Sequence, residues 1–328
     1  MFASRLLCAL AVVTPLVAPV VAVGQTPVNT RQTNARSPLT AQTPPRSPAL
    51  PAPQSNGRLP SLTAEAVLLM NSDGQVLFAK NAESDHAPAS LVKLMTLYLA
   101  FEDIEAGRAT LEDPVVISHA AATTPRYRMG LREREVVPLR ILLEGVAIAS
   151  ANDAATAVAE HLSADEETFV ARMNAHAREF GMSATRYANP HGLPDPVQRS
   201  NARDIAVLMG RLLQDYPAAR TMLGGQTFIY RGRVYARNIS LFSDPGGVQA
   251  LKTGFTREAG YNLAVSAWRA GQQFLMIVLG ARTRAQSYLD GKKLLRYGFV
   301  EAGIEPQPDT RPQPTPKRPV RARATTRG

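Results

Sequence analysis

Ser90 and Lys93 are the residues of this sequence whose types and spacing point most directly to catalysis. They stand three positions apart in an apolar segment, so a helix there would place the hydroxyl and the amine on one face. A serine hydroxyl becomes a good nucleophile only when a nearby base takes its proton. A lysine amine can be that base when it is neutral, and burial favours the neutral form by lowering its pKa. The pair therefore predicts a serine nucleophile activated by a buried lysine.

Two further patterns strengthen this prediction, because a serine and a lysine at this spacing are ordinary on any helix surface. Ser150 and Asn152 stand at a break between helical segments, and a Lys-Thr-Gly triplet occupies residues 252–254 in an extended segment. By themselves, Ser150 and Asn152 are typical of a helix cap. Each pattern occurs once, and their order is that of the penicillin-recognising serine enzymes. Together the three patterns indicate such an enzyme.

The elements that must position these residues follow from the hydrophobic pattern. Apolar runs bounded by turn residues predict strands at 64–70, 75–80, 249–255, 262–269 and 273–280. Helical patterns cover 88–106, 139–216 and 287–297, the first of them closed by Gly107 and largely buried. Strands from both ends of the chain around a helical middle predict an α+β fold, with one antiparallel sheet of about five strands, a helical layer and a subdomain.

Composition separates a folded body from three segments that we expect not to join it. Residues 1–24 are typical of a signal peptide, with one early basic residue, an apolar run and small residues at the end. Residues 25–60 predict a disordered linker rich in Pro, Thr and Gln, and residues 305–328 a disordered, basic, Pro-rich tail. Residues 61–304 are then expected to be the catalytic domain of an exported protein.

Charge and side-chain chemistry exclude several other classes of function. The formal net charge of +10 lies mainly in the two end segments, which leaves the body nearly neutral and argues against nucleic-acid binding. The basic tail is expected to make at most a weak contact with an anionic wall or membrane surface. The only cysteine, Cys8, lies in the predicted signal peptide. His176 and Glu179 share a helix face without a third ligand nearby, so we expect no metal and no cofactor.

A family resemblance extends well beyond the three motifs. Residues 64–300 resemble the low-molecular-mass penicillin-binding proteins, specifically the serine-type D-alanyl-D-alanine carboxypeptidases of peptidase family S11. The segments that carry it are 150–154, 189–193 (Asn-Pro-His-Gly-Leu), 252–256 and 259–263 (Ala-Gly-Tyr-Asn-Leu). The resemblance implies a β-lactamase/transpeptidase-like fold and hydrolysis of the terminal D-Ala-D-Ala bond of peptidoglycan pentapeptide stems, with β-lactams as covalent inhibitors.

The resemblance also implies a role for each polar motif residue. Ser90 would be acylated, and Lys93 would be its base. Ser150 would pass a proton to the leaving amine, and Asn152 would hold Lys93 and the substrate backbone. Lys252 would attract the terminal carboxylate of the substrate and keep Lys93 neutral through like-charge repulsion.

The strand around Lys252 would bind the substrate peptide. Thr253, Gly254 and Phe255 would align the peptide as an added strand, and the small Gly254 would let it approach closely. The backbone N–H groups of Ser90 and Phe255 would form the oxyanion hole.

Two departures from the family pattern bear on substrate binding. Many relatives carry an Asp-Gly pair just before the Lys-Thr-Gly strand, where this chain has the Gln-Ala-Leu of residues 249–251. Carboxypeptidase relatives often carry an arginine where Ser287 falls. Arg282 and Arg284 are close in sequence and could replace it, so the residue that anchors the carboxylate stays open.

Three alternative functions deserve comparison with the carboxypeptidase. A D,D-endopeptidase that cuts peptidoglycan crosslinks would use the same nucleophile, and residues 252–256 also resemble those relatives. A β-lactamase is disfavoured because Ala151 occupies the centre of the second motif and no later Glu-x-x-x-Asn pattern follows. A catalytically inactive wall-binding protein is disfavoured because every polar motif residue is present.

Overall fold

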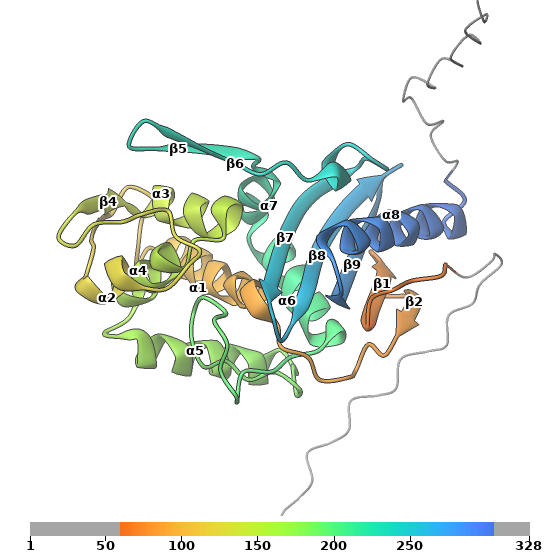
Figure 1. Ribbon diagram of the computed structural model, residues 1–328, viewed down its shortest axis with the longest axis horizontal. Helices are drawn as coiled ribbons and strands as arrows, with labels where there is room; N and C mark the ends of the chain where they lie inside the picture. The colour runs from red at the N-terminus through yellow and green to blue at the C-terminus, as the bar shows by residue number, and fades with distance from the viewer. Residues whose placement is uncertain (1–59, 305–328) are drawn as a thin grey trace, which may run out of the picture. The chain divides into compact units, whose positions relative to one another are not determined.

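The computed structural model describes residues 60–304, which contain a five-stranded antiparallel sheet with helices on both faces (Figure 1). The strands are β1 (Ala66–Asn71), β2 (Val76–Lys80), β7 (Val248–Thr256), β8 (Gly260–Arg269) and β9 (Gln272–Ala281). Their order is β2-β1-β9-β8-β7, so the hairpin at the start of the described chain pairs with strand β9 from its end. This confirms the predicted α+β fold.

The predicted end segments fall outside this description. The signal peptide at 1–24, the linker at 25–60 apart from Pro60, and the tail at 305–328 lie outside the described residues. Their boundaries stay predictions.

Strand β9 is apolar throughout because both faces of the sheet are covered. Phe274, Met276 and Val278 belong to a core shared with helix α8 (Arg284–Glu301). Ile277 and Leu279 belong to the core beneath the helices on the other face. Successive side chains of a strand point to opposite faces, so a strand buried on both sides carries a continuous apolar run.

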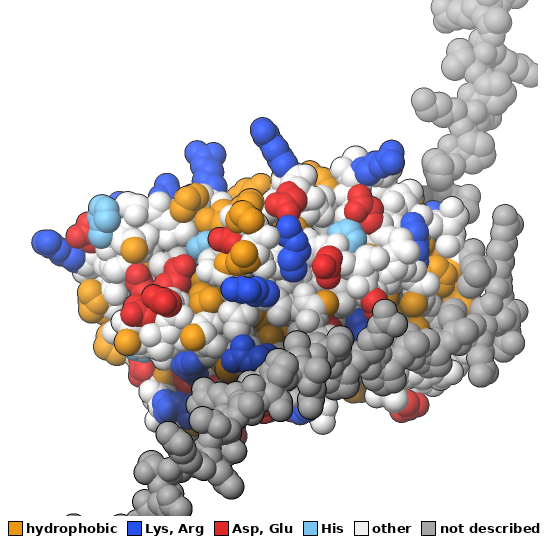
Figure 2. Space-filling view, turned by 90° about the horizontal axis from the view of Figure 1, so that it is seen from below, with side chains coloured by type: hydrophobic (Ala, Val, Ile, Leu, Met, Phe, Trp, Pro, Cys, Tyr) orange, Lys and Arg blue, Asp and Glu red, His pale blue; other side chains and the backbone are white. Residues whose placement is uncertain are grey.

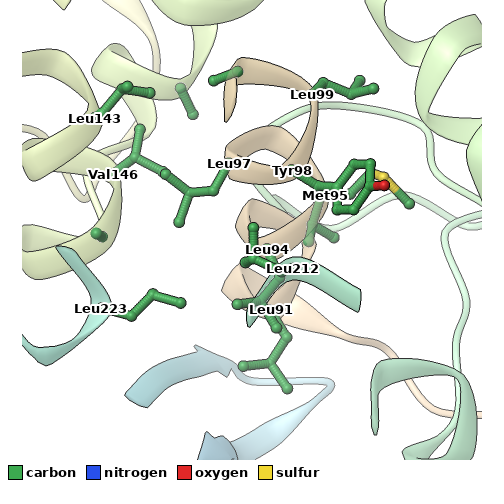
Figure 3. Close-up of a cluster of buried hydrophobic side chains, with 14 of the residues drawn as sticks. Leu91, Leu94, Met95, Leu97, Tyr98, Leu99, Leu143, Val146, Leu212 and Leu223 are labelled. Carbon is green, nitrogen blue, oxygen red and sulfur yellow. The ribbon is translucent and has the colours of Figure 1, made fainter. Parts of the chain in front are cut away.

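The other helices form the second, larger layer. They are α1 (Lys93–Glu105), α2 (His119–Thr123), α3 (Leu139–Glu144), α4 (Asn152–Leu162), α5 (Glu166–Glu179), α6 (Ala202–Asp215) and α7 (Pro217–Gly224). Helix α1 is buried on all sides from residue 93 to residue 101. In Figure 3, Leu97 points towards Val146 of the π-helical segment Gly145–Ala149, whereas Tyr98 points to the opposite side. A helix surrounded in this way is apolar on every face.

The structure differs from the sequence prediction in three places. The segment predicted as one helix at 88–106 begins with a 3₁₀ turn, η1 (Ala89–Val92), before α1. Helix α8 begins earlier than predicted because the hydroxyl of Thr283 accepts a hydrogen bond from the backbone N–H of Gln286 and caps it. Two short ribbons were not predicted: β3 (Pro114–Val116) with β4 (Val136–Pro138), and β5 (Thr227–Tyr230) with β6 (Arg233–Ala236).

The described surface carries charges of both signs. On the face seen in Figure 2, Lys and Arg side chains occur among Asp and Glu side chains. None of the helices within residues 60–304 is long and apolar enough to span a bilayer.

Candidate active site

The three motifs converge where η1, the start of α4 and strand β7 meet. Lys93 Nζ lies 3.2 Å from Ser90 Oγ, and it donates a hydrogen bond of 2.7 Å to Asn152 Oδ1. Lys252 Nζ donates to Ser150 Oγ at 2.7 Å. The 3₁₀ turn explains the first contact, because side chains three residues apart are eclipsed in that geometry. Residues far apart in sequence thus form two hydrogen-bonded lysine–serine pairs.

Burial controls the charge of the first lysine. The Lys93 side chain is completely buried, and this burial lowers its pKa to about 7, while the nearby Asp153 carboxylate opposes the shift. The backbone N–H groups of Met129, Gly130 and Leu131 all donate to Asp153. A neutral Lys93 is therefore accessible near neutral pH.

The second lysine differs from its sequence-based description. Burial lowers the pKa of Lys252 well below its ordinary value, and the charges of Lys93 and Arg237 add to this effect. The like-charge repulsion therefore acts mainly on Lys252, whereas Lys93 owes its lowered pKa to burial. Burial is thus the main cause of the lowered pKa of Lys93, and the role expected of Lys252 in keeping Lys93 neutral stays a prediction.

Asn152 connects Lys93 to one wall of the site. Its side-chain amide donates to the carbonyls of Pro125 and Arg126, at 3.0 Å and 2.7 Å. Its backbone N–H donates to the carbonyl of Tyr127. With both ends of its amide engaged, the Asn152 oxygen is held in position to accept from Lys93.

Ser150 adopts a left-handed backbone conformation, with φ of 56°. That conformation costs a residue with a side chain about 1–2 kcal/mol of conformational free energy, whereas glycine adopts it without this cost. Such strain is common where a side chain must be aimed into a functional site. Here it directs the hydroxyl towards Lys252.

This strain predicts a difference between two variants of Ser150. We expect Ser150→Gly to be more stable than Ser150→Ala by about 1 kcal/mol, because both lose the hydroxyl but only glycine relieves the backbone. Urea unfolding of the two proteins measures the difference. Equal midpoints would show that the left-handed conformation carries no cost.

The loop 189–193 supports the site through its backbone. Lys93 Nζ donates to the carbonyl of His191, and Thr96 Oγ1 donates to the carbonyl of Pro190 at 2.5 Å. The His191 side chain is buried, and burial together with the Lys93 charge lowers its pKa to about 3, so the ring is neutral. The contribution of His191 to the site is therefore its backbone carbonyl, which accepts from Lys93.

Gly192 is the position in this loop where a side chain cannot fit. Its φ is 85°, and a Cβ there would lie 2.0 Å from the carbonyl oxygen of Ala89, next to Ser90. We expect Gly192→Ala to lower the free energy of unfolding by about 2–4 kcal/mol and to slow acylation of Ser90, because the clash displaces η1.

A matched control separates the clash from the backbone conformation. Gly181 has a φ of 69° but open space around its missing Cβ, so Gly181→Ala should cost only about 1–2 kcal/mol. Chemical denaturation and penicillin labelling of both variants give the comparison. If Gly181→Ala impaired labelling as much as Gly192→Ala, the close approach to Ala89 would not be the cause.

A cleft of about 410 Å³ opens onto this network. Ser90, Ser150, Thr253, Gly254 and Phe255 line it. The other three predicted site residues lie beneath it: Lys93 and Lys252 are completely buried, and Asn152 nearly so. Direct contact of a bound ligand is thus possible for the serines and the strand, whereas the lysines act from below.

Strand β7 is well placed to receive an extended ligand. It is the last strand of the sheet on its side, so no strand of the described part of the chain pairs with one edge of its backbone. A Cβ on Gly254 would lie 3.1 Å from the backbone nitrogen of Ser90 and 3.2 Å from the carbonyl of Pro88. Glycine therefore lets β7 and the nucleophile approach closely. Phe255 stacks on Tyr261, with ring centroids 4.3 Å apart.

The structure also brings residues into the cleft that the sequence did not indicate. These are Tyr127, Arg128, Arg233, Tyr235 and Arg237, together with their neighbours in β6 and the loop before β4. Arg284 and Ser287 line the cleft, whereas Arg282 does not. Ser287 is buried, and its hydroxyl donates to the Arg284 carbonyl. The alternating pattern of residues 227–236 around an Arg-Gly turn is a hairpin signal that could have revealed part of this wall.

No group of three or more His, Cys, Asp or Glu side chains within residues 60–304 is arranged to hold a metal ion. His176, considered above as a possible ligand, contacts Glu179 and Glu102 instead. It also stacks against Phe180.

Comparison with known proteins agrees with this geometry. Residues 53–283 match the family model of the Peptidase_S11 group, described as D-alanyl-D-alanine carboxypeptidase. The chain belongs to this S11 family. The S11 chain is 35% identical over 261 residues to the D-alanyl-D-alanine carboxypeptidase DacC of Escherichia coli, an alignment that covers 77% of this chain and 65% of that protein. It spans slightly less than two thirds of the length of the first curated relatives that it matches.

Solved structures of related proteins share the fold of this S11 chain. Penicillin-binding protein 5 of Haemophilus influenzae superposes with a TM-score of 0.72 at 33% identity, covering 74% of this chain and 73% of that one. Penicillin-binding protein D2 of Listeria monocytogenes, in a cefotaxime-bound form, gives a TM-score of 0.68 at 28% identity. That alignment covers 74% of this chain and all of the Listeria chain. The transpeptidase-like fold is therefore confirmed.

Proposed function

We propose that this protein hydrolyses the terminal D-Ala-D-Ala bond of peptidoglycan pentapeptide stems and releases D-alanine. The observation that carries the proposal is the contact of Ser90 with a completely buried Lys93, beside an edge strand that can receive a peptide. The family and the activity named for its relatives support the choice of substrate.

Acylation begins with proton transfer from Ser90 to Lys93. The neutral amine accepts the hydroxyl proton as the serine oxygen attacks the carbonyl carbon between the two D-alanines. The backbone N–H groups of Ser90 and Phe255 stabilise the negative oxygen of the tetrahedral intermediate. When the C–N bond breaks, Ser150 gives its proton to the leaving amine and receives the proton that Lys93 took from Ser90. D-alanine departs, and Lys93 is neutral again.

Deacylation restores the enzyme. Water attacks the ester carbonyl of the acyl-enzyme, and Lys93 again takes the proton. As the ester bond breaks, Lys93 returns this proton to Ser90 Oγ, and the shortened peptide leaves with a new carboxylate. Asn152 holds the Lys93 amine through both steps. Lys252 acts through Ser150, whose hydroxyl it orients.

The substrate is held by β7 and by Arg284. The peptide lies along the free edge of β7 at Thr253, Gly254 and Phe255 as an added strand. Arg284 meets the terminal carboxylate, since its guanidinium lines the cleft and no other described residue engages it in a hydrogen bond or an ion pair. Arg284 thus takes the role of the arginine that carboxypeptidase relatives often carry at the position of Ser287.

The same proposal covers inhibition and location. Penicillins acylate Ser90, which the β-lactam-bound structures of the Listeria relative support by analogy. Residues 61–304 form the catalytic domain of a protein exported to the periplasm or cell envelope. The basic tail at 305–328 makes a weak contact with an anionic wall or membrane surface.

Mass spectrometry of peptidoglycan fragments incubated with the purified protein tests the activity. We expect pentapeptide monomers to lose one alanine. Conversion of crosslinked dimers to monomers without this loss would instead support the endopeptidase, and rapid nitrocefin hydrolysis would support a β-lactamase. Fragments left unchanged by a correctly folded protein would refute the proposal.

A further inference from the structure

Four arginines line the cleft: Arg128, Arg233, Arg237 and Arg284. No aspartate or glutamate of the described residues lines it with them, and within residues 60–304 none of the four has an ion-pair partner. A concave surface lined by charges of one sign concentrates ligands of the opposite sign. The cleft is therefore suited to a ligand with more than one negative charge.

Two of these arginines already have a role. Arg237 donates to the backbone carbonyls of Gly225, Ala147 and Leu251, at 2.8 Å, 3.2 Å and 2.8 Å, and also to Leu223. It therefore ties the end of β6 to the interior. Arg284 meets the terminal carboxylate in the proposed function. Arg128 donates a hydrogen bond to the carbonyl of Ala122 at 3.2 Å, which leaves its charge uncompensated. One carboxylate at Arg284 thus leaves Arg128 and Arg233 without an ion-pair partner among the described residues.

Arg128 and Arg233 lie on one wall of the cleft. The Arg233 guanidinium is 4.9 Å from the centre of the Tyr235 ring, which holds it in place. The Tyr235 hydroxyl donates to the carbonyl of Met129 at 2.5 Å, one residue after Arg128. Tyr235 therefore joins the β6 side of this wall to the loop that carries Arg128.

This wall is joined through Arg237 to the segments that carry Ser150 and Lys252. Arg237, at the end of β6, contacts the carbonyls of Ala147 and Leu251, and the chain leads from these to Ser150 and Lys252. In the proposed mechanism Ser150 protonates the leaving amine. Ser150, Arg128 and Arg233 line the same cleft, so a group attached to that amine enters the cleft that these arginines line.

We propose that Arg128 and Arg233 form a subsite for a second carboxylate on the residue that leaves. The preferred substrates are D-alanyl peptides whose residue after the scissile bond is an amino acid with two carboxylates. One of these pairs with Arg284, and the other pairs with Arg128 and Arg233. This inference rests on the proposed function and refines its substrate class.

Three synthetic peptides test the subsite, with the same acylated D-alanine followed by D-Ala, D-Glu or D-Gln. D-Glu and D-Gln have similar size and differ in the side-chain charge. We expect kcat/KM, measured from the released amino acid, to be about threefold to tenfold higher for D-Glu than for D-Gln at low salt, and the ratio to fall as salt is added.

Variants locate the effect. Arg128→Gln and Arg233→Gln should each lower the D-Glu to D-Gln ratio, and the double variant should bring it close to one. Arg282→Gln is the matched control, because Arg282 is exposed beside α8 but does not line the cleft, and it should keep the wild-type ratio.

The outcomes distinguish this inference from the proposed function. The subsite would be overturned if the wild-type protein released D-Ala but had a D-Glu to D-Gln ratio of kcat/KM near one. It would also be overturned if the double variant kept the wild-type ratio. Either result would leave the proposed carboxypeptidase activity intact. No release from any peptide, together with no penicillin adduct, would overturn both.

Discussion

Ser90→Ala is expected to abolish the covalent penicillin adduct and to lower peptide hydrolysis by at least about 10⁴-fold, because no other hydroxyl within residues 60–304 contacts Lys93. Fluorescent penicillin labelling followed by gel electrophoresis reports the adduct, and intact-protein mass spectrometry confirms its absence. The fold should persist, since Ser90 is small and only partly buried.

Ser84→Ala is the matched control for this experiment. Ser84 lies six residues earlier, is exposed and does not line the cleft, so its variant should label like the wild type. An adduct that survived in Ser90→Ala would place the nucleophile elsewhere, with Ser150 as the next hydroxyl to replace.

The second large effect concerns the protonation of Lys93. Lys93 can accept a proton only when it is neutral, so the rate constant of acylation by penicillin should rise with pH through the Lys93 pKa of about 7 and level off above it. Below that pH the rate should fall about tenfold for each unit, because the neutral fraction falls by that factor. Stopped-flow measurement of acylation from pH 5 to pH 9 gives the profile.

Replacing the base removes this dependence. We expect Lys93→Gln to acylate about 10³-fold more slowly and without the inflection near neutral pH. Lys293 on α8 is partly exposed, lies outside the cleft and donates to the Ser61 carbonyl, so Lys293→Gln should keep the wild-type profile. A wild-type rate that is constant over the whole range would rule out Lys93 as the titrating base.

The strands predicted from the sequence agree closely with the strands of the sheet, because the signals that predict them are local. Strands β1, β2, β7, β8 and β9 carry strong apolar runs bounded by turn residues, and these signals depend on neighbours in the sequence. The ribbons β3–β4 and β5–β6 have strands of only three or four residues, so their signal is weak. Their positions depend on contacts such as the Tyr230 hydroxyl with Glu135, which no local pattern contains.

The candidate site shows the same division. The spacing of Ser90 and Lys93 indicated a shared face, and the 3₁₀ turn provides it. The sequence indicated the loop 189–193 only through the family resemblance. Its contribution is made by backbone carbonyls, which accept hydrogen bonds from Lys93 and Thr96, and every residue type has such a carbonyl. The wall of the cleft formed by Arg128 and Arg233 was not predicted, since the two residues come from separate segments of the chain.

The sequence by itself determined the types, order and spacing of the reactive groups, and hence the class of chemistry, because these are properties of neighbouring residues along the chain. Tertiary structure decided how those groups are charged and what else they meet. Packing around α1 buries Lys93 and lowers its pKa, packing around β7 places Lys252 under the cleft, and the meeting of β6 with the loop before β4 brings Arg128 and Arg233 together. Burial and long-range contact depend on the whole fold, so no local pattern in the sequence specifies them.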